Sequence, residues 1–199
     1  MTHLLLIVLL TQAEPRDSVI YTLAPTSIFE VTTGKSGLFG FAGHEHTIRA
    51  RAFSGRVVYR PDSIAASRVE ITVLTDGLEV LTPPDTEEIR KVTASMRTEV
   101  LDVAHYPEIR LVSGRITGDA RNLEMTAALT IRGQTREVPL TIALEISPDT
   151  LRVTSAFTVK QTDFGIRPYR GGPAGTVRVA DRVKFSIKAL ATRCSGPPC

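Results

Sequence analysis

From Leu123 to Ala191, apolar residues alternate with charged or hydroxylated residues at nearly every second position. Side chains of a β-strand point alternately to its two faces, so this spacing predicts half-buried strands. The apolar positions form four sets: Leu123, Met125, Ala127, Leu129 and Ile131; Val138, Leu140, Ile142, Leu144 and Ile146; Leu151, Val153, Phe157 and Val159; Val183, Phe185, Ile187 and Ala189. A sheet with one apolar face must cover it, and closing into a barrel or sandwich does so.

The N-terminal half has the same character. Further strands are expected at residues 18–23, 28–33, 44–53, 55–60, 68–74 and 108–117, with a bulge at Ser54-Gly55. The pattern therefore predicts an all-β fold, an antiparallel barrel of about eight strands. At that number, a barrel interior is either packed solid or holds one small ligand.

One segment, about residues 85–103, has helical periodicity instead. Ile89, Val92, Met96 and Val100 are spaced by three or four residues, which places them on one helix face. Asp85 followed by Glu88 is a capping pattern, and Pro107 ends the segment. We expect one inserted α-helix that plugs or borders one end of the barrel.

The chain divides into three parts. Residues 1–13 are expected to be a signal peptide, because the apolar run Leu4–Leu10 precedes small residues and is too short to span a bilayer. No Lys or Arg precedes that run, and a buried first strand is the alternative. Residues 14–192 form the barrel domain, and residues 193–199 a tail whose Cys194 and Cys199 either pair or lie in a disordered end. An exported protein would be periplasmic or secreted.

The charge pattern bears on partners. The chain has 24 Lys and Arg against 21 Asp and Glu, and its basic residues are scattered over polar strand positions. Nucleic-acid surfaces cluster basic residues among aromatic ones, whereas this chain has no Trp and 6% aromatic residues. We therefore expect no nucleic-acid partner.

Several segments resemble the YceI-like family in order and spacing. They are Phe53–Asp62, Val100–Ile109, Leu129–Val138, Thr162–Pro168 and Val179–Val183, within a match from Ser18 to Ala191. The resemblance implies an exported, lipocalin-like antiparallel barrel whose elongated apolar cavity binds isoprenoid or other amphiphilic lipid chains. The chain differs where the family has a Lys-His-Leu-Gly-like element, because Gly43-His44-Glu45-His46 and a glycine-rich loop stand there. The resemblance does not identify the ligand.

The candidate ligand-binding residues lie at the expected cavity mouth and along its wall. His44, His46 and Ile48 share the inward face of one strand, beside the glycine-rich loop over the opening. The full candidate set is His44, His46, Ile48, Leu38, Phe39, Phe41, Met96, Leu129, Ile142, Phe157 and Phe185.

Two other functions remain open. His44, His46 and His105 could form a metal site, since zinc requires at least three protein ligands. Alternatively, the interior is solid and the domain is structural or binds a partner protein. Small inward residues, among them Ala127, Ser155 and Ala189, favour some empty volume.

Motifs for catalysis are incomplete. Asp163-Phe164-Gly165 lacks the other kinase motifs and is interpreted as a structural corner. Gly171–Gly175 lacks a following Lys-Ser/Thr, so it is not a phosphate loop. We therefore expect a protein that is not an enzyme, has no cofactor and binds a long-chain lipid. The sequence leaves open whether it is a monomer or a homodimer.

Overall fold

The computed structural model describes residues 18–36, 45–81, 86–119, 121–171 and 177–196. Within them one antiparallel sheet contains twelve strands: β1 (Val19–Leu23), β2 (Ile28–Ser36), β3 (His46–Ala50), β4 (Phe53–Tyr59), β5 (Arg68–Leu74), β6 (Leu78–Val80), β7 (Glu108–Gly118), β8 (Asn122–Ile131), β9 (Gln134–Ile146), β10 (Thr150–Lys160), β11 (Arg170–Gly171) and β12 (Val177–Arg193). The helix α1 (Thr86–Ser95) continues as a π-helical segment, Met96–Val100.

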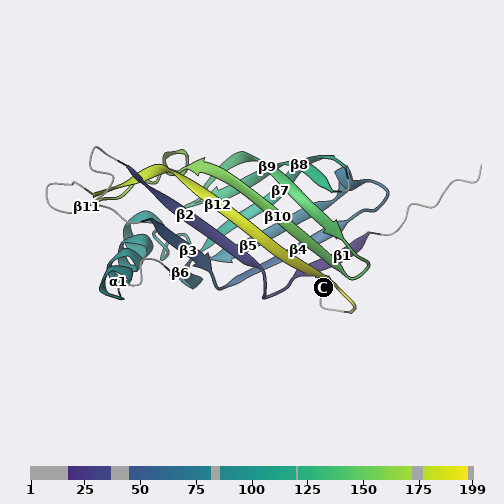
Figure 1. The fold of residues 1–199 in the computed structure, drawn as a ribbon, viewed down its shortest axis with the longest axis horizontal. Helices are drawn as coiled ribbons and strands as arrows, with labels where there is room; N and C mark the ends of the chain where they lie inside the picture. Colours follow the sequence, from purple (N-terminus) through teal and green to yellow (C-terminus); the bar gives the residue numbers. More distant parts are fainter. Residues whose placement is uncertain (1–17, 37–44, 82–85, 120, 172–176, 197–199) are drawn as a thin grey trace, which may run out of the picture.

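The sheet closes into a barrel of eight strands (Figure 1). Its neighbours follow the order β1-β4-β5-β7-β8-β9-β10-β12, and β12 pairs with β1 to complete the ring. β2, β3 and β6 neighbour β1, β4 and β5, respectively, along the chain, and a kink separates the two strands of each pair. β2, β3 and β6 lie toward the end of the barrel that carries α1. The prediction of about eight antiparallel strands with one helix is confirmed. No helix in these residues has the length and apolarity to cross a membrane.

One kink replaces the expected bulge. β3 and β4 are separated by a bend at Arg51-Ala52, whereas Ser54 and Gly55 pair in regular register with Thr72 and Ile71 of β5. The bulge predicted at Ser54-Gly55 is therefore wrong. Gly55 is needed for packing, because a Cβ there would lie 2.5 Å from Cδ1 of Leu23.

The helix is shorter than expected at its C-terminal end. Helical structure stops at Val100, and Asp102 has a positive φ of 50°, a left-handed conformation that ends a helix. The expected apolar face is confirmed, because Met96 is buried and Ile89, Val92 and Val100 are half-buried. α1 packs beside β6, whose only strand partner among the described residues is β3. The expected capping residue Asp85 lies outside the described residues.

The β8–β9 hairpin anchors this helical segment. Its two central residues, Arg132 and Gly133, have φ values of 48° and 68°, which is typical of a type I′ turn. The guanidinium of Arg132 lies 5.7 Å from the ring centre of Tyr106 and donates a hydrogen bond to the Val100 carbonyl at 3.3 Å. The hairpin therefore holds the end of the helical insertion against the barrel.

Gly133→Ala is expected to lower the free energy of unfolding by about 1–2 kcal/mol, because an L residue is strained in the left-handed region. The added Cβ would also lie 3.1 Å from Cε1 of Tyr106. Gly165→Ala is the matched control that separates backbone strain from the contact with Tyr106. Gly165 also has a left-handed φ, of 69°, but no atom lies within 4 Å of the position that a Cβ would take there. Urea unfolding measures both variants. Wild-type stability for Gly133→Ala would contradict the assigned turn.

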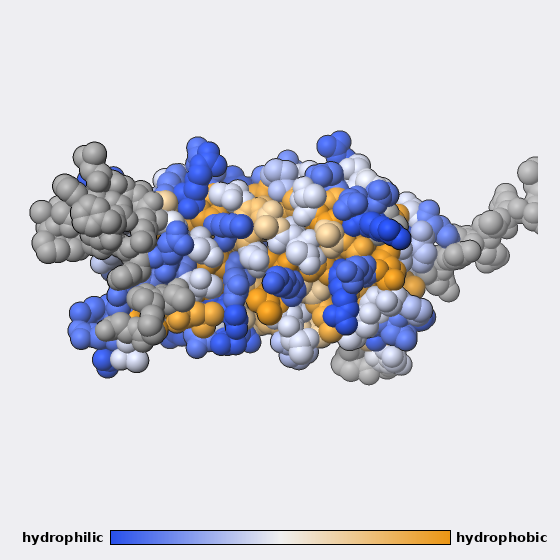
Figure 2. Space-filling view, in the orientation of Figure 1, coloured by the Kyte–Doolittle hydropathy of each residue, from blue (hydrophilic) through white to orange (hydrophobic). Residues whose placement is uncertain are grey.

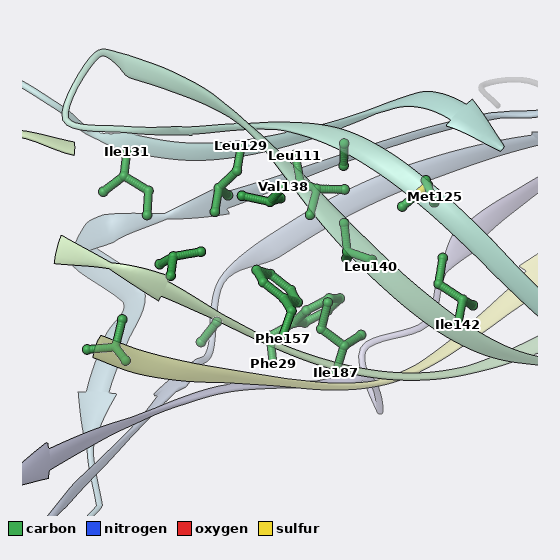
Figure 3. Packing of buried hydrophobic residues seen from close by; sticks show 14 of the residues in the cluster. Phe29, Leu111, Met125, Leu129, Ile131, Val138, Leu140, Ile142, Phe157 and Ile187 are labelled. Atoms are coloured by element: carbon green, nitrogen blue, oxygen red, sulfur yellow. The ribbon is translucent and has the colours of Figure 1, made fainter. Parts of the chain in front are cut away.

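Buried apolar side chains point into the barrel from all sides (Figure 3). Alternate residues of β8 are buried, with Ala127 at 0% and Leu129 at 1% exposure. Leu129 pairs with Leu111 on the adjacent β7, and Phe157 and Ile187 lie across the interior. Phe164 is 1% exposed within the short helix Gln161–Phe164, and Gly165 follows in a left-handed conformation. The Asp163-Phe164-Gly165 segment is thus built as a corner of the fold.

Candidate functional site

Two cavities lie along the barrel interior. The near cavity, toward α1, has a volume of about 70 Å³, and the far cavity about 100 Å³. Both are lined by Ile71, Leu111 and Ile187, so these three residues lie between the adjoining cavities, and we name them the neck. A cavity needs only about 10–15 Å³ of such volume to hold one water molecule, so both exceed ordinary packing defects.

The two cavities together are elongated. On β10 the lining residues run from Leu151 in the far cavity to Phe157 in the near cavity. Six residues of an antiparallel strand advance about 20 Å, or about 15 Å along a barrel axis when strands tilt by about 40°. Both volumes lie below the roughly 300–1,000 Å³ of pockets for drug-sized molecules. A narrow space of this length suits a linear chain better than a bulky ring system.

The lining is almost entirely hydrocarbon. In the far cavity, Ser155 Oγ donates to the Thr141 carbonyl at 2.8 Å, and Ser67 Oγ accepts from the Arg60 amide at 3.0 Å. The near cavity has one charged lining residue, Glu30, which Arg49 binds through Nε at 2.8 Å. The side-chain hydroxyls of Ser155 and Ser67 and the Glu30 carboxylate are thus already hydrogen-bonded within the protein. The space therefore favours an apolar occupant.

Leaving the two cavities empty lowers the stability of the protein. Unfilled core volume destabilises a protein by about 24 cal/mol per Å³, so the two cavities together cost about 4 kcal/mol. Water does not recover this energy, because apolar cavities of this size stay dry. A hydrocarbon chain that fills the space would restore the missing contacts.

Aromatic side chains shape the near cavity. Phe157 and Phe185 face each other across β10 and β12, stacked with ring centres 4.9 Å apart and planes 9° apart. Phe29 lines the same cavity and meets Phe53 edge to face at 4.9 Å. These rings form a rigid wall directly beside the neck.

The expected site residues fall into several groups. Ile48, Leu129, Phe157 and Phe185 line the near cavity, and Ile142 lines the far cavity. Met96 is buried in the core but lines neither cavity. The remaining candidates in the glycine-rich loop and before β3, namely Leu38, Phe39, Phe41 and His44, lie outside the described residues.

His46 lies at the start of β3, between the barrel and α1. It is 9% exposed, and its Nε2 lies 4.0 Å from Oε1 of Glu88 on α1. Its backbone amide donates to Oγ1 of Thr33 at 3.2 Å. The residue lines neither cavity, so a role for His46 at the mouth stays a prediction.

The alternative metal site has no described cluster behind it. His105 is exposed in the turn before β7, where its Nδ1 lies 2.8 Å from Oδ1 of Asp102. In the described part of the chain, no three His, Cys, Asp or Glu residues are grouped so that they could hold a metal ion. In the tail, Cys194 is disulfide-bonded, and Cys199 lies outside the described residues.

The far end of the barrel contains residues that the sequence did not single out. Ile64, from the short helix Ile64–Ala66, lines the far cavity. The Tyr21 hydroxyl donates to the Pro148 carbonyl at 3.4 Å, and burial raises the pKa of Tyr21, which keeps the phenol neutral. The neck residues are a different case. The alternation of apolar residues identifies Ile71, Leu111 and Ile187 as inward-facing, but only strand pairing brings them together.

Comparisons with known proteins agree with this architecture. The solved structure of Burkholderia cenocepacia BcnA is 18% identical, with a TM-score of 0.65 over 83% of this chain and 96% of that one. A polyisoprenoid binding domain from Saccharophagus degradans is 14% identical, with a TM-score of 0.66 over 88% and 99%. The Campylobacter jejuni YceI protein is 12% identical, with a TM-score of 0.57 over 75% and 85%.

A search among curated proteins found no match. The profile of the YceI-like domain, however, matches residues 21–191, from β1 almost to the end of β12. That span contains all eight strands of the closed barrel and both cavities. The chain belongs to the YceI-like family.

Proposed function

We propose that this protein binds the hydrocarbon chain of one amphiphilic lipid, isoprenoid or fatty-acid-like, in its two adjoining cavities, and that it carries or sequesters that lipid without catalysis. The observation that carries the proposal is the pair of hydrocarbon-lined cavities that follow one another along the barrel. The similarity of the fold to a polyisoprenoid binding domain supports the same class of ligand. The apolar run Leu4–Leu10, interpreted above as part of a signal peptide, supports action in the periplasm or outside the cell.

Apolar burial favours binding without any polar recognition. Each buried methylene contributes about 0.8 kcal/mol, so a chain of roughly ten carbons contributes about 8 kcal/mol before association costs. Isoprenoid and straight chains gain from the same lining, since neither needs a hydrogen-bonding partner. The proposal therefore specifies a class of ligand, molecules with a long hydrocarbon chain, rather than one molecule.

The headgroup belongs outside the cavities. Glu30 is the one charged residue in their described lining, and it is an anion already paired with Arg49. Burying a carboxylate or phosphate without a partner is strongly unfavourable. The ligand would therefore enter tail first.

Native mass spectrometry of the purified protein, followed by solvent extraction, tests the proposal. We expect one lipid-sized adduct per chain that organic solvent removes and that a long-chain alcohol replaces. A protein that carries no organic adduct and takes up no long-chain alcohol would instead have a functionally solid core. Stoichiometric zinc, copper or iron that is lost on His46→Ala but kept on the exposed-site control Arg136→Ala would favour the metal alternative.

A further inference from the structure

The outer face of the C-terminal strands collects positive charge. Between Lys160 and Arg193 the sequence has eight Lys or Arg and only two carboxylates, Asp163 and Asp181, in a chain of net charge +3. Six of these cations, all exposed, lie on or at the ends of β10, β11 and β12: Lys160, Arg170, Arg178, Arg182, Lys184 and Lys188. We name this set the basic strip. Basic residues scattered along the sequence are thus gathered by strand pairing.

Two pairs in the basic strip oppose like charges directly. Lys160 is the cross-strand partner of Arg182, and Arg170 is the partner of Arg178. Directly opposed like charges destabilise a sheet. Lys184 and Lys188 face the hydroxyl residues Thr158 and Thr154, which supply no countercharge. The fold therefore holds cations together without neutralising them.

Three arginines elsewhere on the barrel are neutralised. Cross-strand or neighbouring carboxylates pair with arginines in Arg49–Glu30, Arg51–Glu79 and Arg110–Glu70. No basic-strip residue forms an ion pair within the described ranges. Arg56, Arg115 and Arg136 also form no ion pair there, but they lie singly on different strands. The gathering of its cations on paired strands therefore distinguishes the basic strip and suits it to an external anion.

Nearby carboxylates are engaged elsewhere. Desolvation raises the pKa of Asp181, but hydrogen bonds from the amide and hydroxyl of Thr162, aided by Lys160, outweigh it and lower that pKa overall. Asp181 is therefore ionised and offsets part of the charge of Lys160. Glu30, on the neighbouring β2, is bound by Arg49. The other cations of the basic strip keep their charge available.

We propose that the basic strip docks the barrel onto the surface of an anionic lipid bilayer. β12 crosses the front of the barrel from the end that carries α1 and β11 to the opposite end (Figure 1), and on this face hydrophilic side chains are interspersed with hydrophobic ones (Figure 2). Four strip residues lie where β10, β11 and β12 meet, at the end of the near cavity. Docking would bring that end to the bilayer.

A bilayer fits this surface better than a nucleic acid. The residues between the cations of β10 and β12 are Thr154, Thr158 and Ser186, whereas single-stranded nucleic acids need aromatic rings for base stacking. The choice of a bilayer also rests on the proposed function, because a lipid with a long apolar chain resides in membranes. Anionic headgroups supply the negative charge that the basic strip lacks.

Vesicle co-sedimentation of the lipid-stripped full chain tests the proposal. The probes are vesicles of phosphatidylcholine alone and vesicles with 30% phosphatidylglycerol. We expect binding only to the anionic vesicles, with loss in high salt. Arg182→Ser/Lys184→Ser/Lys188→Ser should weaken it roughly 100-fold, since each cation contributes about 1 kcal/mol near an anionic surface. The matched control, Arg56→Ser/Arg115→Ser/Arg136→Ser, removes three exposed cations from other strands and should bind as wild type.

Several outcomes overturn the proposal: equal binding to neutral vesicles, equal loss in the control, or strip-dependent retention of single-stranded DNA without vesicle binding. Lipid content measured separately distinguishes the two proposals. A chain that holds lipid but ignores anionic vesicles overturns only the docking surface. A chain that binds these vesicles through the basic strip, yet neither holds nor takes up lipid, overturns only the proposed function.

Discussion

Ala189→Phe is expected to weaken binding of a long-chain lipid by about 1,000-fold without destabilising the lipid-free protein. Ala189 lines the far cavity, whose volume of about 100 Å³ has room for an aromatic ring. The ring would displace about five methylenes of the ligand, each contributing about 0.8 kcal/mol, or about 4 kcal/mol in total. A short-chain analogue that occupies only the near cavity should bind as before.

Titration with alcohols of increasing chain length measures this effect, and thermal unfolding measures stability. Ala156→Phe is the matched control, because Ala156 is exposed on the outer face of β10 and contacts neither cavity. In a fully packed core, the added ring would cost about 1–3 kcal/mol of stability. Such a loss, with lipid uptake unchanged, would show that no chain enters the far cavity.

Phe157→Ala is expected to lower the free energy of unfolding of the lipid-free protein by about 3–5 kcal/mol, the usual range for a buried Phe. Phe157 is buried, stacks on Phe185 and lines the near cavity beside the neck. A bound hydrocarbon chain can occupy part of the space that the ring leaves. The destabilisation should therefore be smaller in the lipid-loaded variant than in the lipid-free one.

Urea unfolding of both variants, with and without a saturating long-chain alcohol, measures the difference. Thr158→Ala serves as the control, because Thr158 is the exposed neighbour on the outer face of the same strand. Its effect should stay within about 0.5 kcal/mol. If lipid leaves the loss in Phe157→Ala unchanged, the chain does not reach the near cavity.

Local chemistry made much of the fold predictable. The two-residue period from Leu123 onward identified the strands β8, β9, β10 and β12 and their inward faces, because neighbouring side chains point to opposite faces of a strand. The prediction failed at Gly55, where a glycine serves a packing contact with Leu23, and at Asp102, whose left-handed conformation ends the helical segment early.

For the candidate site, inward alternation found individual wall residues such as Leu129, Ile142 and Phe157, which line the cavities. It did not place His46, because burial against α1 depends on how the helix packs on the barrel. Met96 shows the same limit: its helical spacing predicts burial correctly but does not say which space the side chain meets. The local sequence shows which residues point inward, but it does not show where these residues lie relative to a cavity.

The residue pattern was enough to predict the longer strands, their apolar faces, the inserted helix and the family, but it missed the short strands β6 and β11. The tertiary structure alone decided that β12 closes on β1, that Ile71, Leu111 and Ile187 meet at one neck, and that cations distant in sequence oppose each other across strands. The physical reason is that alternation sets which face a side chain takes, whereas only strand pairing and register set its neighbours.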